Sequence, residues 1–265
     1  MLHFIPTFGS RKVAQETNQF LRDNRATFWR IFLPLTPYIA ALTTLDTLLT
    51  HFAMPEGKSF TYGKLASYYF IACLTISWLR INISGKENLT TANPLKPTKS
   101  ELTFMATALG IFSLPILITT IMPFITANTS SIITSLLLGF MASFILSLIA
   151  SYKFAFYFPA LANGHDLTIP AAFKLTKGYV EKTISTTIRT AFKHLLKTLT
   201  FLATITIAKF ILGHSKTENP LIPFLYDLIT SLTLALYFIP LLIITALSVL
   251  SHYYQDARAK GAPQT

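Results

Sequence analysis

The chain has 265 residues, of which 52% are hydrophobic and 12% charged, and its mean hydropathy is +0.51. Ordinary soluble domains carry about 25% charged residues, so this composition argues against a water-soluble domain and is typical of a polytopic membrane protein. The net charge is +11, but the basic residues flank apolar stretches and form no polar basic domain. This arrangement excludes nucleic acid as an expected partner and favours the anionic headgroups of membrane lipids.

Six apolar stretches are long enough to cross about 30 Å of hydrocarbon as helices. The sequence therefore predicts an all-α polytopic membrane protein whose six transmembrane helices lie at 28–53, 62–83, 102–126, 131–161, 191–213 and 221–252. They would form one membrane domain over 28–252. An N-terminal segment at 1–27 and a tail at 253–265 would flank it, both in the cytoplasm.

The basic residues predict the orientation of these spans. Six spans place both termini on one side, and eighteen Lys and Arg residues lie on that side or at nearby span ends, against four on the other. Cytoplasmic segments of inner-membrane proteins carry such an excess. We therefore expect a multi-pass protein of the bacterial inner membrane with cytoplasmic N- and C-termini.

Two cytoplasmic segments have amphipathic helical patterns. The first, Arg11–Arg30, resembles a helix that lies on the membrane surface and leads into the first span. The second is the connection at about 163–190, where Thr168 can cap a short helix, Gly178 can end it, and a further helix can begin near Tyr179.

A basic face follows helical spacing along this further helix and consists of Lys182, Arg189, Lys193 and Lys197. Near an acidic membrane surface, each such charge contributes about 1 kcal/mol to the binding of anionic lipid. A topology signal explains the same pattern equally well, so both interpretations stay open.

Charged residues also fall within the spans or at their rims, at Asp46, Lys209 and Asp227. An ionisable group at the centre of the bilayer costs about 2.5–3.5 kcal/mol and less near the interface. One interpretation is that these groups reach water or pair with one another. The other is that Asp46 and Lys209 line a polar cavity in a solute or proton pathway.

The predicted fourth span carries a stripe of small residues at every fourth position, made of Ser135, Gly139, Ser143, Ser147 and Ser151. Small residues allow another helix to approach closely. The stripe therefore predicts packing within the bundle, or else the seam of a homodimer or of a complex with another membrane protein.

Motifs for catalysis are missing from the sequence. It has no glycine-rich phosphate loop, and its six histidines lack the spacing of a zinc site, so we expect no metal, no cofactor and no enzymatic activity. The pair His165-Asp166 is interpreted as part of a solvated loop. The single cysteine, Cys73, excludes a disulfide within the chain.

The sequence from Lys153 to Ala160 reads KFAFYFPA, and the sequence from Ala171 to Gly178 reads AAFKLTKG. Together they resemble a pattern in a broad bacterial superfamily that includes the membrane domains found with glycerophosphodiester phosphodiesterases. The resemblance implies a six-helix inner-membrane bundle with an amphipathic cytoplasmic connection. It does not carry over hydrolysis, because this chain has no catalytic domain beside its predicted membrane domain.

These patterns predict a structural or accessory component in lipid or envelope processes. The alternative is a small permease or transporter subunit with a polar cavity near Asp46 and Lys209.

Overall fold

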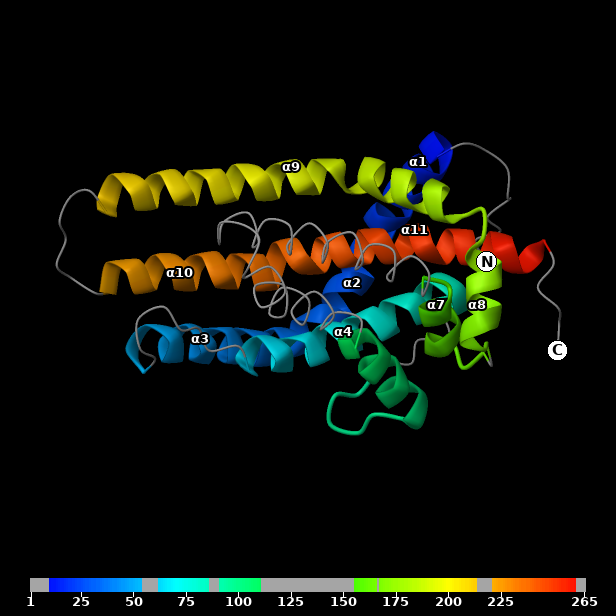
Figure 1. The fold of residues 1–265 in the computed structure, drawn as a ribbon, viewed down its shortest axis with the longest axis horizontal. Helices are drawn as coiled ribbons and strands as arrows, with labels where there is room; N and C mark the ends of the chain where they lie inside the picture. The colour runs from blue at the N-terminus through cyan, green and yellow to red at the C-terminus, as the bar shows by residue number, and fades with distance from the viewer. Residues whose placement is uncertain are drawn as a thin grey trace, which may run out of the picture.

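The computed structural model describes residues 10–53, 62–85, 91–110, 155–165, 167–213 and 221–260, with the backbone alone at 62–68 and 209–213. All regular elements within these ranges are helices, and no strand occurs among them, which confirms the all-α prediction. Helix packs on helix throughout: α9 runs along α11, α11 along α4, α4 along α3, and α3 along α10 (Figure 1).

Four consecutive elements form the N-terminal part: α1 (Ser10–Asp23), α2 (Arg25–Phe32), the 3-10 helix η1 (Leu33–Leu35) and α3 (Thr36–Phe52). Asn24 separates the first two, and its side-chain Nδ2 donates to the carbonyl of Phe20 at 2.8 Å. Pro34 and Pro37 lie in the first turns of η1 and α3, where a missing amide proton costs no helical hydrogen bond. The helix α1 packs against α9 and α11.

The middle of the chain contributes α4 (Tyr62–Ser84), a helical stretch at 99–110, α7 (Tyr157–Ala162) and α8 (Ile169–Thr176). Thr168 caps α8 by accepting a hydrogen bond from the Ala171 amide at 3.4 Å, and Gly178 follows the helix with a positive φ of 86°. These positions confirm the two local signals read from the sequence. Of the predicted span at 131–161, the described part consists of a turn at 155–156 followed by the first residues of α7.

The C-terminal half contains α9 (Val180–Gly213), α10 (Leu221–Thr233), the π-helix η3 (Leu234–Phe238) and α11 (Ile239–Ala259). The helix α11 continues to Ala259, so the first residues of the predicted cytoplasmic tail at 253–265 are helical. Tyr253 and Tyr254 are buried there, and the Tyr253 hydroxyl lies 2.8 Å from the hydroxyl of Thr186 on α9. Contacts with α9 and α7 thus keep the helix ordered beyond its apolar stretch.

Two helical segments of the described chain are long and apolar enough to cross a membrane, Arg25–Phe52 and Leu221–Ala259. A shorter apolar helix covers Tyr69–Ser84. These segments coincide with the predicted first, sixth and second spans, whereas the predicted fifth span, 191–213, lies in α9 and is not among them. Most of the predicted third and fourth spans lies outside the described residues.

The main core joins α1, α2, α3, α4 and the 99–110 helix around Trp78, whose side chain is fully buried. The rings of Phe20 and Phe28 meet the Trp78 ring edge-on, each with a centroid separation of 6.0 Å. Its indole Nε1 donates to Ser248 Oγ on α11 at 2.9 Å. This single residue therefore fixes the relative positions of three segments that are distant in sequence.

Candidate functional site

A groove of about 640 Å³ lies between the N-terminal helices, α9 and the η3–α11 segment. We call it the α1–α9 groove. Its described lining consists of Gln15, Asn18, Gln19, Leu21, Arg22, Arg25, Phe28, Trp29, Lys193, His194, Lys197, Tyr237, Leu241, Ile244 and Thr245.

Four exposed basic side chains belong to this lining and form what we call the basic rim: Arg22, Arg25, Lys193 and Lys197. The first pair lies where α1 meets α2, and the second pair lies one turn apart on α9. Packing of α1 along α9 brings the two pairs to the same groove. None of the described lining residues is acidic, so the local potential is positive.

Amide side chains extend the polar part of the groove on α1, at Gln15, Asn18 and Gln19. Gln19 Nε2 donates to Asp23 Oδ1 at 2.9 Å, which turns this carboxylate toward its own helix. Amide groups donate and accept hydrogen bonds, so they suit the phosphate and glycerol oxygens of a headgroup as well as they suit water.

Below the basic rim, the groove has an apolar floor. Phe28 and Ile244 are buried in it, while Trp29 and Leu241 remain partly accessible. Tyr237 adds an exposed aromatic ring from η3. A ligand in this groove can therefore place a charged end on the basic rim and an apolar end on the rings.

The π-helix η3 has an identifiable cause in the sequence. Pro240 cannot donate a backbone hydrogen bond, and its ring collides with the carbonyl of Leu236 in a regular helix. The chain widens over Leu234–Phe238 just before this proline. Such π segments recur at functional sites, and here one of its residues, Tyr237, lines the groove.

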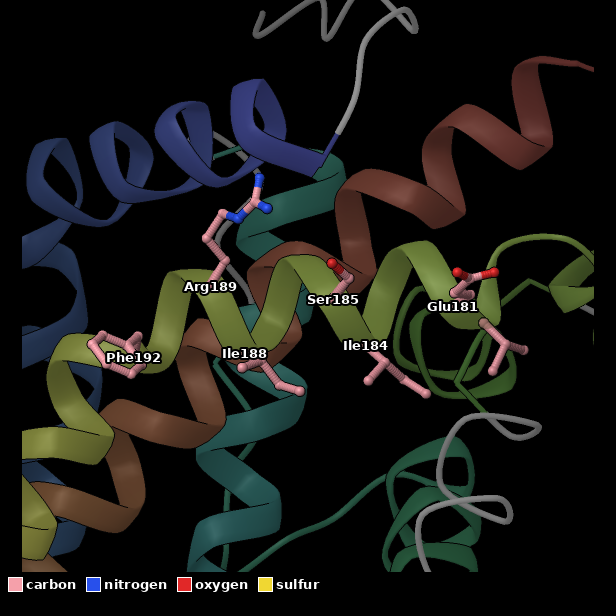
Figure 2. A pocket seen from close by; sticks show the side chains of 7 residues that line it. Glu181, Ile184, Ser185, Ile188, Arg189 and Phe192 are labelled. Atoms are coloured by element: carbon pink, nitrogen blue, oxygen red, sulfur yellow. The ribbon is translucent and has the colours of Figure 1, made fainter.

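The structure divides the basic face that the sequence singled out for lipid binding. Lys193 and Lys197 line the α1–α9 groove, but Lys182 lies with its Nζ 6.0 Å from the ring centre of Tyr179. Arg189 lines a second depression of about 860 Å³ on α9 and points toward α1 (Figure 2). In that view Ile184 and Ile188 extend on the other side of the helix.

The face of the α9 helix that packs toward the core carries threonines. Thr183, Thr186 and Thr190 are buried, and Thr190 Oγ1 donates to the Thr186 carbonyl at 2.7 Å. In contrast, Ile188 and Phe192 are more than half exposed. Several large apolar side chains of α9 therefore face outward while its threonines pack inward.

Two of the three charged residues predicted within the spans are described with their side chains. Asp46 is 4% exposed in α3. Asp227 Oδ2 lies 2.8 Å from His51 Nε2, which joins α10 to α3 and shows that Asp227 is paired. The backbone at Lys209 belongs to α9, and its side chain lies outside the described part, so a cavity shared by Asp46 and Lys209 stays a prediction.

The small-residue stripe at Ser135, Gly139, Ser143, Ser147 and Ser151 also lies outside the described residues. Within the described ranges, no group of three or more His, Cys, Asp or Glu side chains could hold a metal ion.

His165 lies in the connection between α7 and α8, as predicted, but it is only partly exposed and contacts α11. Its Nδ1 lies 3.2 Å from the Tyr254 hydroxyl, and its Nε2 lies 3.1 Å from Arg258 NH1. Burial and the nearby Arg258 charge lower the pKa of His165. The connection between α7 and α8 is thus held against the last turns of α11, at the same end of the molecule (Figure 1).

Comparison of the chain with protein-family models, curated proteins and solved structures found no match. The functional argument therefore rests on the residues of the chain itself.

Proposed function

We propose that the chain is an integral protein of the bacterial inner membrane that holds an anionic phospholipid of the cytoplasmic leaflet in the α1–α9 groove. It would act as an accessory component in lipid or envelope processes and have no enzymatic activity of its own. The observation that carries this proposal is the basic rim above an apolar floor within one groove. Basic pockets between membrane helices on the cytoplasmic side bind phospholipid headgroups in this way.

The proposed topology has six spans with both termini in the cytoplasm. The two long apolar segments and the shorter one support three of these spans, and the sequence supplies the rest. The excess of Lys and Arg on one side of the predicted spans supports the orientation. This orientation places the basic rim on the cytoplasmic side. Reporter fusions in the 86–90 and 214–220 connections would report on opposite sides of the membrane; reporters on the same side would contradict the topology.

Membership of the superfamily whose members include phosphodiesterase-linked membrane domains is part of the proposal. The second of the two resembling segments, Ala171–Gly178, forms most of α8 and the turn after it. This helix fits the amphipathic cytoplasmic connection that the resemblance implies.

Trp29 offers a direct test of lipid binding, because it lines the groove, whereas Trp78, the second of two tryptophans, is fully buried. The full chain would be placed in phosphatidylcholine nanodiscs containing phosphatidylglycerol with brominated acyl chains. Bromine quenches tryptophan fluorescence at short range, so we expect quenching beyond that produced by brominated phosphatidylcholine at the same mole fraction.

The Trp29→Phe variant is the matched control and should lose this additional quenching. Equal quenching by the anionic and the zwitterionic lipid would contradict the proposal.

A small permease or transporter subunit is the second candidate function. A buried carboxylate at Asp46 and the His51–Asp227 pair lie on the adjacent helices α3 and α10, which places ionisable groups within the proposed spans. A permease should accumulate a solute in proteoliposomes and lose this activity in Asp46→Asn and Lys209→Met. An accessory protein should instead copurify with a membrane partner or as a homodimer and show no such dependence.

A further inference from the structure

From the charge of the α1–α9 groove we infer that it selects phospholipids whose headgroups carry at least two negative charges. This inference rests on the proposed function and adds the class of lipid. Phosphomonoester lipids and lipids with two phosphodiester groups belong to this class, whereas phosphatidylglycerol carries one charge.

The charges of the basic rim and of the headgroup must balance. The basic rim contributes four positive charges, and none of the described lining residues is acidic. A headgroup with a single phosphodiester leaves three of these charges without an anion and close to one another. A second negative charge on the headgroup therefore gains attraction from side chains that are already in position.

The arrangement of the basic rim supports the same conclusion. Arg22 and Arg25 approach from the junction of α1 and α2, while Lys193 and Lys197 approach from α9. Arginine binds phosphate oxygens in a planar two-pronged geometry, and lysine acts as a mobile point charge. A headgroup with several anionic oxygens can be bound from both walls at once.

The apolar floor indicates that the ligand is a lipid and not a free phosphate. Trp29, Tyr237 and Leu241 line the same groove as the basic rim. Aromatic and aliphatic surface of this kind is covered favourably by acyl chains. A free phosphate would contact the rim but leave these rings exposed.

The experiment compares three lipids with brominated acyl chains, each titrated into phosphatidylcholine nanodiscs that contain the full chain. The lipids are phosphatidylglycerol, phosphatidic acid and cardiolipin, normalised to the number of acyl chains. At about 1 kcal/mol per basic residue near the surface, an additional charge contact corresponds to about a fivefold change in affinity. We expect the two more highly charged lipids to reach half-maximal quenching of Trp29 at about fivefold lower mole fractions than phosphatidylglycerol.

Two double variants distinguish the effect of the groove on lipid preference from the effect of general surface charge. The double variant Arg22→Gln with Lys193→Gln removes one charge from each wall and should weaken the preference. The control Lys174→Gln with Lys177→Gln removes two exposed charges from α8 and its C-terminal turn and should retain it. Thermal unfolding in the same nanodiscs would verify that all variants are folded.

The possible outcomes are distinguishable. Equal half-quenching by all three anionic lipids, or equal loss of preference in both double variants, would overturn the inference while leaving lipid binding intact. The proposed function itself would be overturned if no brominated anionic lipid quenched Trp29 more strongly than brominated phosphatidylcholine does. Reversal of quenching by excess glycerol 3-phosphate would show that a free phosphate suffices, which would also overturn the inference.

Discussion

Arg80 NH1 lies 2.7 Å from Glu101 Oε1, in a salt bridge whose side chains are only 15% and 4% exposed. Arg80 Nε also donates to the Ala162 carbonyl at 2.9 Å, so one side chain connects α4, the 99–110 helix and α7. Glu101 Oε2 accepts the Thr98 amide at 2.7 Å and completes a capping box at the start of its helix. The salt bridge therefore organises the connection that follows α4.

Replacing Arg80 by Met should lower the free energy of unfolding by about 3–5 kcal/mol, because it leaves the Glu101 carboxylate buried without its countercharge. The double variant Arg80→Met with Glu101→Leu should recover most of this loss, since neither charge then remains. Unfolding by a denaturing detergent in mixed micelles measures both effects. A double variant as unstable as the single one would show that the pair does not act as a unit.

Acidification should weaken the same connection. Burial raises the pKa of Glu101, but hydrogen bonds from the Thr98 amide and from Arg80, together with the Arg80 charge, bring it below its ordinary value of 4.5. A lowered pKa in the folded state means that the stabilisation is complete above pH 4.5 and is lost as the pH falls through the folded-state pKa. The melting temperature of the wild type should therefore fall more steeply below pH 4.5 than that of Glu101→Gln.

The His51–Asp227 pair should contribute measurably to the packing of α10 on α3. A partly buried hydrogen bond to a carboxylate is worth about 1 kcal/mol, so a double-mutant cycle with His51→Ala and Asp227→Ala should show coupling of that size. The exposed Lys12–Glu16 pair, 3.9 Å apart on α1, is the control and should couple by only about 0.3 kcal/mol. Equal coupling in the two cycles would contradict a specific role for His51.

Mild acid should loosen the contact between the α7–α8 connection and α11. Burial and the Arg258 charge lower the pKa of His165 below its ordinary value of 6.5. The unfolded chain then binds a proton more readily than the folded one, so stability is lost as the pH falls through 6.5 toward the folded-state pKa. The drop in melting temperature between about pH 7.5 and about pH 5.5 should be smaller in His165→Gln than in the wild type. An identical drop would assign the pH dependence to other groups.

Local chemistry explains what the sequence predicted correctly. The α8 helix follows from Thr168 at its start and Gly178 after its end, because a cap and a positive φ depend only on adjacent residues. The capping box of Thr98 and Glu101 has the same local character, although it was not among the predictions. The positions of the helices in the apolar stretches likewise follow from the length and composition of those stretches.

The inward face of α9 could not be predicted by the same means. By polarity alone, Ile188 and Phe192 would mark the buried face, but they are more than half exposed, while Thr186 faces the core with its hydroxyl 2.8 Å from that of Tyr253. Half of the basic rim, Lys193 and Lys197, lay within the predicted lipid-binding face. The other half depends on the packing of α1 along α9, which no local pattern specifies.

The π-helix η3 (Leu234–Phe238) also determines how the following helix, α11, is rotated about its axis. A π-helical turn accommodates one residue more than an α-helical turn, so α11 is rotated by about 100° relative to a continuation of α10. With this register, Ser248, Ser251 and His252 lie in a stretch of α11 in which every residue from 248 to 254 is buried. Deleting one residue from η3 would change which neighbours each of these side chains meets, so this short π-helix sets the rotational register of the C-terminal helix.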